Sequence, residues 1–201
     1  MTTATTTQRP VLSTTDRWLA LAGIAGVGGF VGAWVGLGAT RDGYSPVDDA
    51  ISRLAEDGAA TQPWMTLGFV AFGVGIPLYA MALRKALAGP AWISATITGL
   101  AIFGVAVFPL GVADEAHGAF AGLGYITLAA TPLLAARTFR SQGHQRWAIG
   151  SLVAGVASAV LLTASIGEPL HGAFQRAGLA ATDVWIVATA WTIWRSGRLP
   201  G

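Results

Sequence analysis

The sequence contains no cysteine. It therefore has no disulfide, thiolate nucleophile, iron–sulfur cluster or zinc site with cysteine ligands. It also lacks the P-loop, the dinucleotide-binding fingerprint and the HExxH and GxSxG motifs, which indicate nucleotide binding, zinc peptidase or serine hydrolase chemistry. A function has to be inferred from polar residues that lie outside these motifs.

Charge is scarce as well. Only 11% of the 201 residues are charged, whereas soluble domains carry about 25%. Hydrophobic residues make up 53% of the chain, and the mean hydropathy is +0.58. The net charge is only +2, and the arginines are too scattered to form a nucleic-acid-binding surface. This composition indicates a protein whose surface mostly contacts lipid.

Six long apolar runs predict an all-α fold, a polytopic membrane bundle of six transmembrane helices. The runs are 18–39, 64–83, 91–108, 118–136, 147–166 and 177–194. Residues 1–15 are predicted to be a disordered cytoplasmic tail, and residues 16–198 the transmembrane domain. In the first run Gly28, Gly32 and Gly36 recur every four residues, a spacing that lets membrane helices pack closely, and we expect them to support a homo-oligomer.

The basic residues predict the orientation. If all six runs cross the membrane, nine of the twelve lysines and arginines fall on the side of the termini, and Arg41, Arg53 and Arg176 fall on the other. Positive charge stays cytoplasmic, so both termini are predicted to be cytoplasmic in a multi-pass protein of the cell membrane. The first outer loop is expected to hold a short amphipathic helix at about 46–56, because Ser45 and Pro46 suit a helix start.

The unusual polar residues converge on the outer side. The stretch 108–120 reads FPLGVADEAHGAF, and its ending His-Gly-Ala-Phe recurs at 171–174. Asp183 lies about 10 Å into the last run, a depth at which a charge needs a partner such as Arg53 or Arg176. The candidate catalytic residues are Ser52, Asp114, His117 and His171, and the candidate ligand-binding residues are Arg53, Glu168, Arg176 and Asp183. His117 and His171 are also candidate ligands of a divalent metal such as zinc, or they simply cap helix starts.

Three short motifs resemble a known family. They are Tyr44-Ser-Pro with the following Ile51-Ser52-x-Leu54, Phe108-Pro109 ahead of Asp114 and His117-Gly118, and Gln175-Arg176 before a tryptophan-bearing last run. Over about residues 17–195 the chain is similar to domain-of-unknown-function family 998, membrane proteins of bacteria and archaea. The resemblance implies a six-helix integral protein of the plasma membrane with signature positions at Ser52, His117 and Arg176. Gln175 stands where an acidic residue is expected, and the family brings no established activity.

A looser resemblance is to membrane hydrolases of the alkaline ceramidase and progestin-receptor type. These proteins use a Ser, an Asp and three His around zinc within a seven-helix bundle. Here Ser52, Asp114, His117 and His171 are available, but there are only six runs and no third outer histidine. Asp183 or Glu168 would have to complete the zinc shell.

Three functions follow as hypotheses. The first is an outer-facing polar pocket that binds a lipid headgroup or small amphiphile, with Arg53 and Arg176 on its anionic group. The second is a metal-dependent lipid hydrolase built on His117 and His171. The third is a small proton-coupled transporter, because Asp183 is intramembrane and Pro77 permits a kinked helix.

Overall fold

The computed structural model describes residues 11–167 and 169–199, and within these ranges it contains six α-helices, one 3-10 helix and no strand. The elements are α1 (Thr14–Thr40), η1 (Ile51–Ala55), α2 (Gln62–Ala86), α3 (Ala91–Val107), α4 (Asp114–Ser141), α5 (Gln145–Ala164) and α6 (His171–Ser196). The prediction of an all-α fold with six long helices is confirmed. Most of the predicted tail lies outside the described residues, and α1 begins at Thr14 after the Ser13 cap.

Four of these helices, α1, α2, α4 and α5, are long and apolar enough to cross a membrane. The apolar helix α3 is shorter, with 17 residues, and α6 carries Arg176 and Asp183 within its length. Four such helices suggest a multi-pass membrane protein, since a soluble fold has no reason to leave this many long apolar surfaces uncovered.

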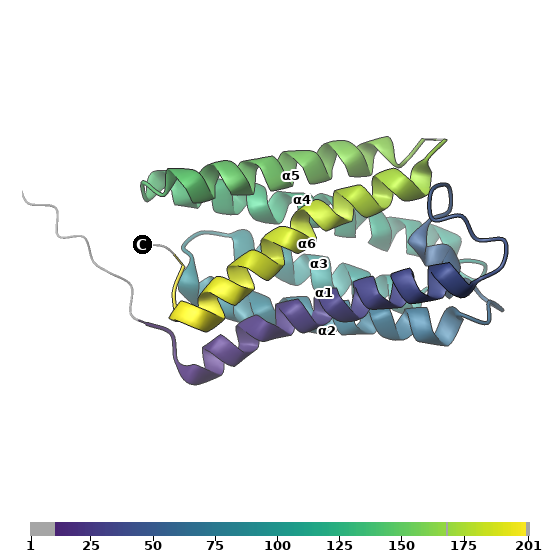
Figure 1. Ribbon diagram of the computed structural model, residues 1–201, viewed down its shortest axis with the longest axis horizontal. Coiled ribbons are helices and arrows are strands. Elements are labelled where there is room, and N and C mark those ends of the chain that lie inside the picture. Colours follow the sequence, from purple (N-terminus) through teal and green to yellow (C-terminus); the bar gives the residue numbers. More distant parts are fainter. Residues whose placement is uncertain (1–10, 168, 200–201) are drawn as a thin grey trace, which may run out of the picture.

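Successive helices are antiparallel neighbours, and α6 returns to pack against α1, which closes the bundle (Figure 1). We name the two ends of the bundle the termini end and the loop end. The termini end holds the start of α1, the end of α6 and the α2–α3 and α4–α5 turns. The loop end holds η1 and the α1–α2, α3–α4 and α5–α6 connections (Figure 1).

Contacts between α1 and α6 close the termini end. Arg17 donates from Nε to the carbonyl oxygen of Trp194 at 2.6 Å, and it also reaches the carbonyl of Arg195. These are carbonyls of the last turn of α6, which lack partners within the helix. The backbone N–H of Leu12 donates to the carbonyl of Gly197. On the neighbouring helix, Lys85 pairs with Asp16 at 2.6 Å.

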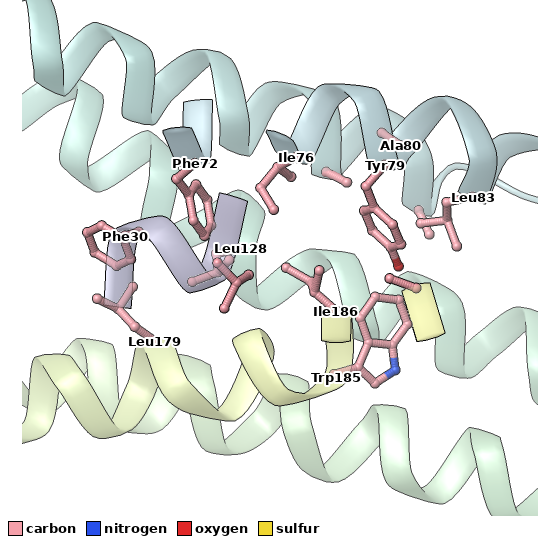
Figure 2. Close-up of a cluster of buried hydrophobic side chains, with 14 of the residues drawn as sticks. Phe30, Phe72, Ile76, Tyr79, Ala80, Leu83, Leu128, Leu179, Trp185 and Ile186 are labelled. Carbon is pink, nitrogen blue, oxygen red and sulfur yellow. The ribbon is translucent and has the colours of Figure 1, made fainter. Parts of the chain in front are cut away.

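The core is apolar and runs along the centre of the bundle (Figure 2). Some of the polar side chains within it bond to each other across helices. The Tyr79 hydroxyl lies 2.7 Å from Thr189 Oγ1, and Trp185 Nε1 donates to Ser151 Oγ at 2.8 Å. Within a bilayer no water is available as a hydrogen-bond partner for an unpaired polar group, so such interhelical bonds stabilise helix packing.

Glycines on α1 and α2 let these two helices approach most closely. A Cβ atom on Gly75 would lie 2.5 Å from the carbonyl oxygen of Ala22. The predicted stripe of Gly28, Gly32 and Gly36 lies elsewhere: all three are exposed, and a Cβ on any of them would meet nothing within 4 Å. They therefore face away from the bundle, and their role in a homo-oligomer stays a prediction.

The amphipathic helix predicted for 46–56 is wrong in its extent. Ser45 does make the expected cap, since its Oγ accepts from the backbone N–H of Asp48 at 3.2 Å. Only Ile51–Ala55 is helical, however, and it is a 3-10 helix. The reason is tertiary: the carbonyls of Pro46, Val47 and Asp49 accept hydrogen bonds from α6 instead of from later residues of the same segment.

We expect Gly75→Ala to destabilise the protein, because the added methyl group forces α1 and α2 apart. Overpacking of this kind costs about 1–3 kcal/mol. The matched control is Gly28→Ala, where the methyl group enters open space. Thermal unfolding in detergent should show a lower melting temperature for Gly75→Ala only; equal melting temperatures for the two variants would contradict the close approach.

Candidate functional site

Arg176 on α6 organises the loop end. Its Nη1 donates to the carbonyl oxygens of Pro46 at 2.7 Å, Asp49 at 3.0 Å and Gly172 at 2.9 Å. Its Nη2 donates to the Tyr44 hydroxyl. The backbone N–H of Ala173 adds a bond to the carbonyl of Val47 at 2.8 Å. One side chain thus fixes the loop that precedes η1 onto the start of α6.

Two aromatic rings flank the Arg176 guanidinium. Its carbon lies 5.2 Å from the centroid of the Trp34 ring and 5.6 Å from that of Tyr44, within the range of cation–π attraction. Burial raises the pKa of the Tyr44 hydroxyl, although nearby Arg176 opposes the shift. Tyr44 therefore stays neutral and donates to the carbonyl of Ala50 at 3.2 Å while it accepts from Arg176.

A small enclosed cavity lies inside the bundle beneath η1. Its volume is about 40 Å³, and its polar lining residues are Ser52, Thr98, His117, Tyr125 and Gln175. Phe30, Phe72, Leu128 and Leu179 form part of its apolar wall and lie together in the core (Figure 2). A water molecule needs roughly 10–15 Å³ of such space, and ligand pockets measure about 300–1,000 Å³. The cavity is thus large enough for a few waters but not for a lipid.

His117 lines this cavity, and its ring is held by a backbone carbonyl. Its Nδ1 lies 2.8 Å from the carbonyl oxygen of Phe108. A carbonyl only accepts, so Nδ1 carries the proton, and Nε2 of the neutral ring is left as an acceptor or base. Gln175 closes the other side: its Oε1 accepts from the N–H of Ile51 at 2.8 Å, and its Nε2 donates to the Tyr125 hydroxyl. The structure therefore brings Ser52 and His117 to one cavity.

A larger groove runs between α1 and α6. Its volume is about 470 Å³, and its lining is apolar except for Arg176 and Asp183. The other lining residues are Val27, Val31, Trp34, Leu179, Ala180, Val184, Val187, Ala188 and Trp191. Both charged residues have a buried atom without a partner in the described part of the chain, Nε of Arg176 and Oδ1 of Asp183. No ion pair joins Asp183 to Arg176 or to Arg53 in these ranges, so the expected pair of Asp183 with one of these arginines is not formed.

Comparison with known families shows the family to which the chain belongs. The model of a family described as protein of unknown function (DUF998) matches residues 24–192. The chain belongs to the DUF998 family. No curated protein and no solved structure matched. The resemblance drawn from short motifs is thus confirmed. The three positions that the resemblance implies as signatures all lie at the loop end: Ser52 and His117 at the cavity and Arg176 beside it.

Three other residues predicted for a site, Asp114, Arg53 and His171, line neither the cavity nor the groove. Asp114 accepts from the N–H of Gly111 at 2.7 Å and so acts at the start of α4. Arg53 is exposed and pairs with Asp49 at 3.0 Å and Glu56 at 3.5 Å. His171 opens α6 and lines neither space. Glu168 lies outside the described residues, and within them no three His, Asp or Glu side chains come close enough to hold a metal ion.

Sequence reasoning did not select Trp34, Tyr44 or Tyr125 as site residues. Tyr44 and Gln175 lie in the short stretches on which the resemblance rests, and this was the available signal for these two positions. Nothing in the sequence marks Trp34 or Tyr125, because their roles depend on which helices become neighbours. The repeated His-Gly-Ala-Phe is likewise ambiguous in sequence, since its two glycines have different surroundings in the fold.

We expect Gly172→Ala to disrupt the loop end of this DUF998 protein. A Cβ at Gly172 would lie 2.6 Å from Arg176 Nη1 and 2.7 Å from the Pro46 carbonyl oxygen, and it would also meet the Asp49 carbonyl. The substitution should lower the melting temperature in detergent and open residues 41–50 to protease. Gly118→Ala is the control from the repeated motif, because its Cβ would meet nothing within 4 Å. Equal protease resistance of the two variants would contradict this account.

Proposed function

We propose that this DUF998 protein binds an amphiphile in the groove between α1 and α6, with the anionic headgroup of the amphiphile at Arg176. One observation carries the proposal: a groove that is apolar apart from Arg176 and Asp183 has at its loop end this arginine, whose buried Nε has no partner among the described residues. The groove thus has a charged group at one end and a long apolar wall, which matches an amphiphile with an anionic headgroup and a hydrocarbon chain. This is the first of the three hypotheses drawn from the sequence, with Arg176 as the anion receptor in place of Arg53.

The dimensions of the groove suit a lipid chain. About 470 Å³ falls within the range of small-molecule sites. Its lining extends from Arg176 to Trp191 on α6, a stretch of about 22 Å along the helix axis. Valine, alanine, leucine and tryptophan side chains make up the rest of the wall. A hydrocarbon chain that lies parallel to the helices would be covered on the protein side by apolar surface.

The chemistry of Arg176 suits an anionic group. Its Nη1 is committed to three backbone carbonyls, whereas its Nε–H has no acceptor. Among the described residues no carboxylate pairs with this guanidinium, so its charge is balanced only by dipoles and aromatic rings. A buried donor left unsatisfied costs about 1–3 kcal/mol. A phosphate or carboxylate oxygen at Nε would recover that cost and neutralise the charge.

A second groove provides a comparison. It lies between α1 and α2, has a similar volume of about 450 Å³, and is lined by residues such as Gly32, Ala33 and Trp64 without any charged side chain. Size and apolarity therefore do not distinguish the two grooves. The two grooves are distinguished by the charged groups with unpartnered atoms, which favour the α1–α6 groove as the specific site.

We also infer that all six helices cross the membrane with both termini in the cytoplasm. The supports are the nine-to-three distribution of basic residues and the length of α3, whose 17 residues give about 26 Å against a hydrocarbon thickness of about 30 Å. In this orientation the loop end, with Arg176, η1 and the cavity, faces outward. The headgroup would then lie in the outer leaflet.

Binding of radiolabelled stearate to the detergent-solubilised protein tests the headgroup site. We expect Arg176→Leu to weaken binding about tenfold, because a charge-assisted hydrogen bond is worth about 1.5–3 kcal/mol and about 1.4 kcal/mol is tenfold. Arg53→Leu should leave the dissociation constant within about twofold, since Arg53 is exposed and paired with acidic residues. The proposal fails if Arg176→Leu binds stearate as wild type does.

A second pair of variants tests the groove without touching the loop. Ala180 is exposed and lines the α1–α6 groove, so Ala180→Phe should fill it and abolish stearate binding. Gly32→Phe fills the α1–α2 groove instead, where a Cβ meets open space. This control variant should bind stearate normally; loss of binding in both variants would place the site elsewhere.

The absence of cysteine makes the topology testable by single-cysteine labelling. Val112 is 66% exposed in the α3–α4 connection, and Gln142 is exposed in the α4–α5 turn. A membrane-impermeant maleimide should label Val112→Cys in intact cells and Gln142→Cys only after permeabilisation. The reverse pattern would invert the orientation, and labelling of both in intact cells would contradict the proposed number of spans.

A further inference from the structure

Asp183 is the polar group that the anion-binding role of Arg176 leaves unexplained. It lies on α6 in the wall of the α1–α6 groove and is only 5% exposed. Its Oδ1 is buried and accepts no hydrogen bond within the described residues. Apart from Arg176, every other residue that lines the groove is apolar or a tryptophan. A buried carboxyl oxygen without a donor is unfavourable in any protonation state, and more so at membrane depth.

Being unpartnered is not sufficient to mark a ligand site. The hydroxyl groups of Ser158 and Thr182 are also buried without a partner in the described ranges. Neither of them lines the α1–α6 groove, the α1–α2 groove or the enclosed cavity. Asp183 differs from them because it borders a space that is large enough to hold a chain, and because a second charged residue with an unpartnered atom borders the same space.

The distance between Arg176 and Asp183 along α6 indicates which part of a bound chain lies beside Asp183. Arg176 and Asp183 are seven residues apart on one helix, so they lie on the same face and about 10 Å apart along the axis. A ligand with its anionic group at Arg176 passes Asp183 with a part of its chain that lies well below the headgroup. An unsubstituted hydrocarbon chain at that depth would leave Oδ1 without a donor.

We propose that the amphiphile bound in the α1–α6 groove carries a hydroxyl or amide N–H on its chain, about 10 Å below its anionic group, and that this group donates a hydrogen bond to Asp183. The inference rests on the proposed function, because it takes the anionic end to be at Arg176. A carboxyl oxygen accepts such a bond whether the acid is ionised or neutral. The ligand class is thus a chain-hydroxylated or amide-linked anionic amphiphile.

Three fatty acids test the position of the donor on the wild-type protein. They are stearate, alpha-hydroxystearate with its hydroxyl beside the carboxylate, and a hydroxystearate with its hydroxyl near the middle of the chain. We expect the mid-chain hydroxy acid to bind about fivefold more tightly than stearate, in line with one additional buried hydrogen bond. Alpha-hydroxystearate should bind like stearate, since its hydroxyl lies too close to the headgroup to reach Asp183.

Two variants assign the preference to Asp183. In Asp183→Leu the preference for the mid-chain hydroxyl should disappear, so that the mid-chain hydroxy acid and stearate bind with equal affinity. In Asp183→Asn it should persist, because the amide oxygen can accept the same bond. Thr182→Val is the matched control, since it removes a neighbouring buried hydroxyl that does not line the groove. It should leave the preference unchanged.

The outcomes separate this inference from the proposed function. Equal binding of the three acids by wild type would overturn the role of Asp183 and leave the amphiphile site standing. A preference that survives in Asp183→Leu, or that alpha-hydroxystearate shares, would overturn the inferred donor position in the same way. Failure of all three acids to bind would remove both proposals together. The comparison of acids in wild type does not depend on whether any variant folds.

Discussion

The constraint on which the loop end depends is that buried backbone carbonyls must find donors within the protein. In the segment before η1, the carbonyls of Pro46, Val47 and Asp49 accept from α6 rather than from later residues of the segment. The donors are the Arg176 side chain and the backbone N–H of Ala173. This arrangement sets the course of the first loop, brings Tyr44 against the guanidinium, and places η1 as the roof of the central cavity.

Two spaces of different character meet at this end of the bundle. The enclosed cavity is small and has several polar groups, whereas the groove is about ten times larger and almost entirely apolar. Leu179 lines both spaces and separates them. Their volumes point to different contents, a few waters near His117 in one and a hydrocarbon chain in the other. The position of Ser52 and His117 at one cavity supports the hydrolase hypothesis. The size of that cavity opposes it, because the cavity is too small for an ester-bearing lipid.

The six helices could be predicted because each apolar run is a local property of the sequence. The gathering of Ser52, His117 and Arg176 at one end also followed, since alternate loops of an antiparallel bundle lie on the same side. The groove could not be predicted, because it requires that α6 return to α1. The extent of η1 was mispredicted because side-chain donors to backbone carbonyls leave no pattern in sequence. Gly118 and Gly172 make the same point: one tetrapeptide occurs in two surroundings.

The contacts of Arg17 with the end of α6 close the bundle at one end only, and the side of the α1–α6 groove carries exposed residues such as Val184 and Trp191. If α1 and α6 both cross the membrane, as proposed, a molecule that enters through this side arrives from within the bilayer and never crosses open water. Its occupancy is then governed by its mole fraction among the surrounding lipids rather than by its aqueous concentration. The groove must then distinguish its ligand from the bulk membrane lipids, because every neighbouring lipid competes for the same surface.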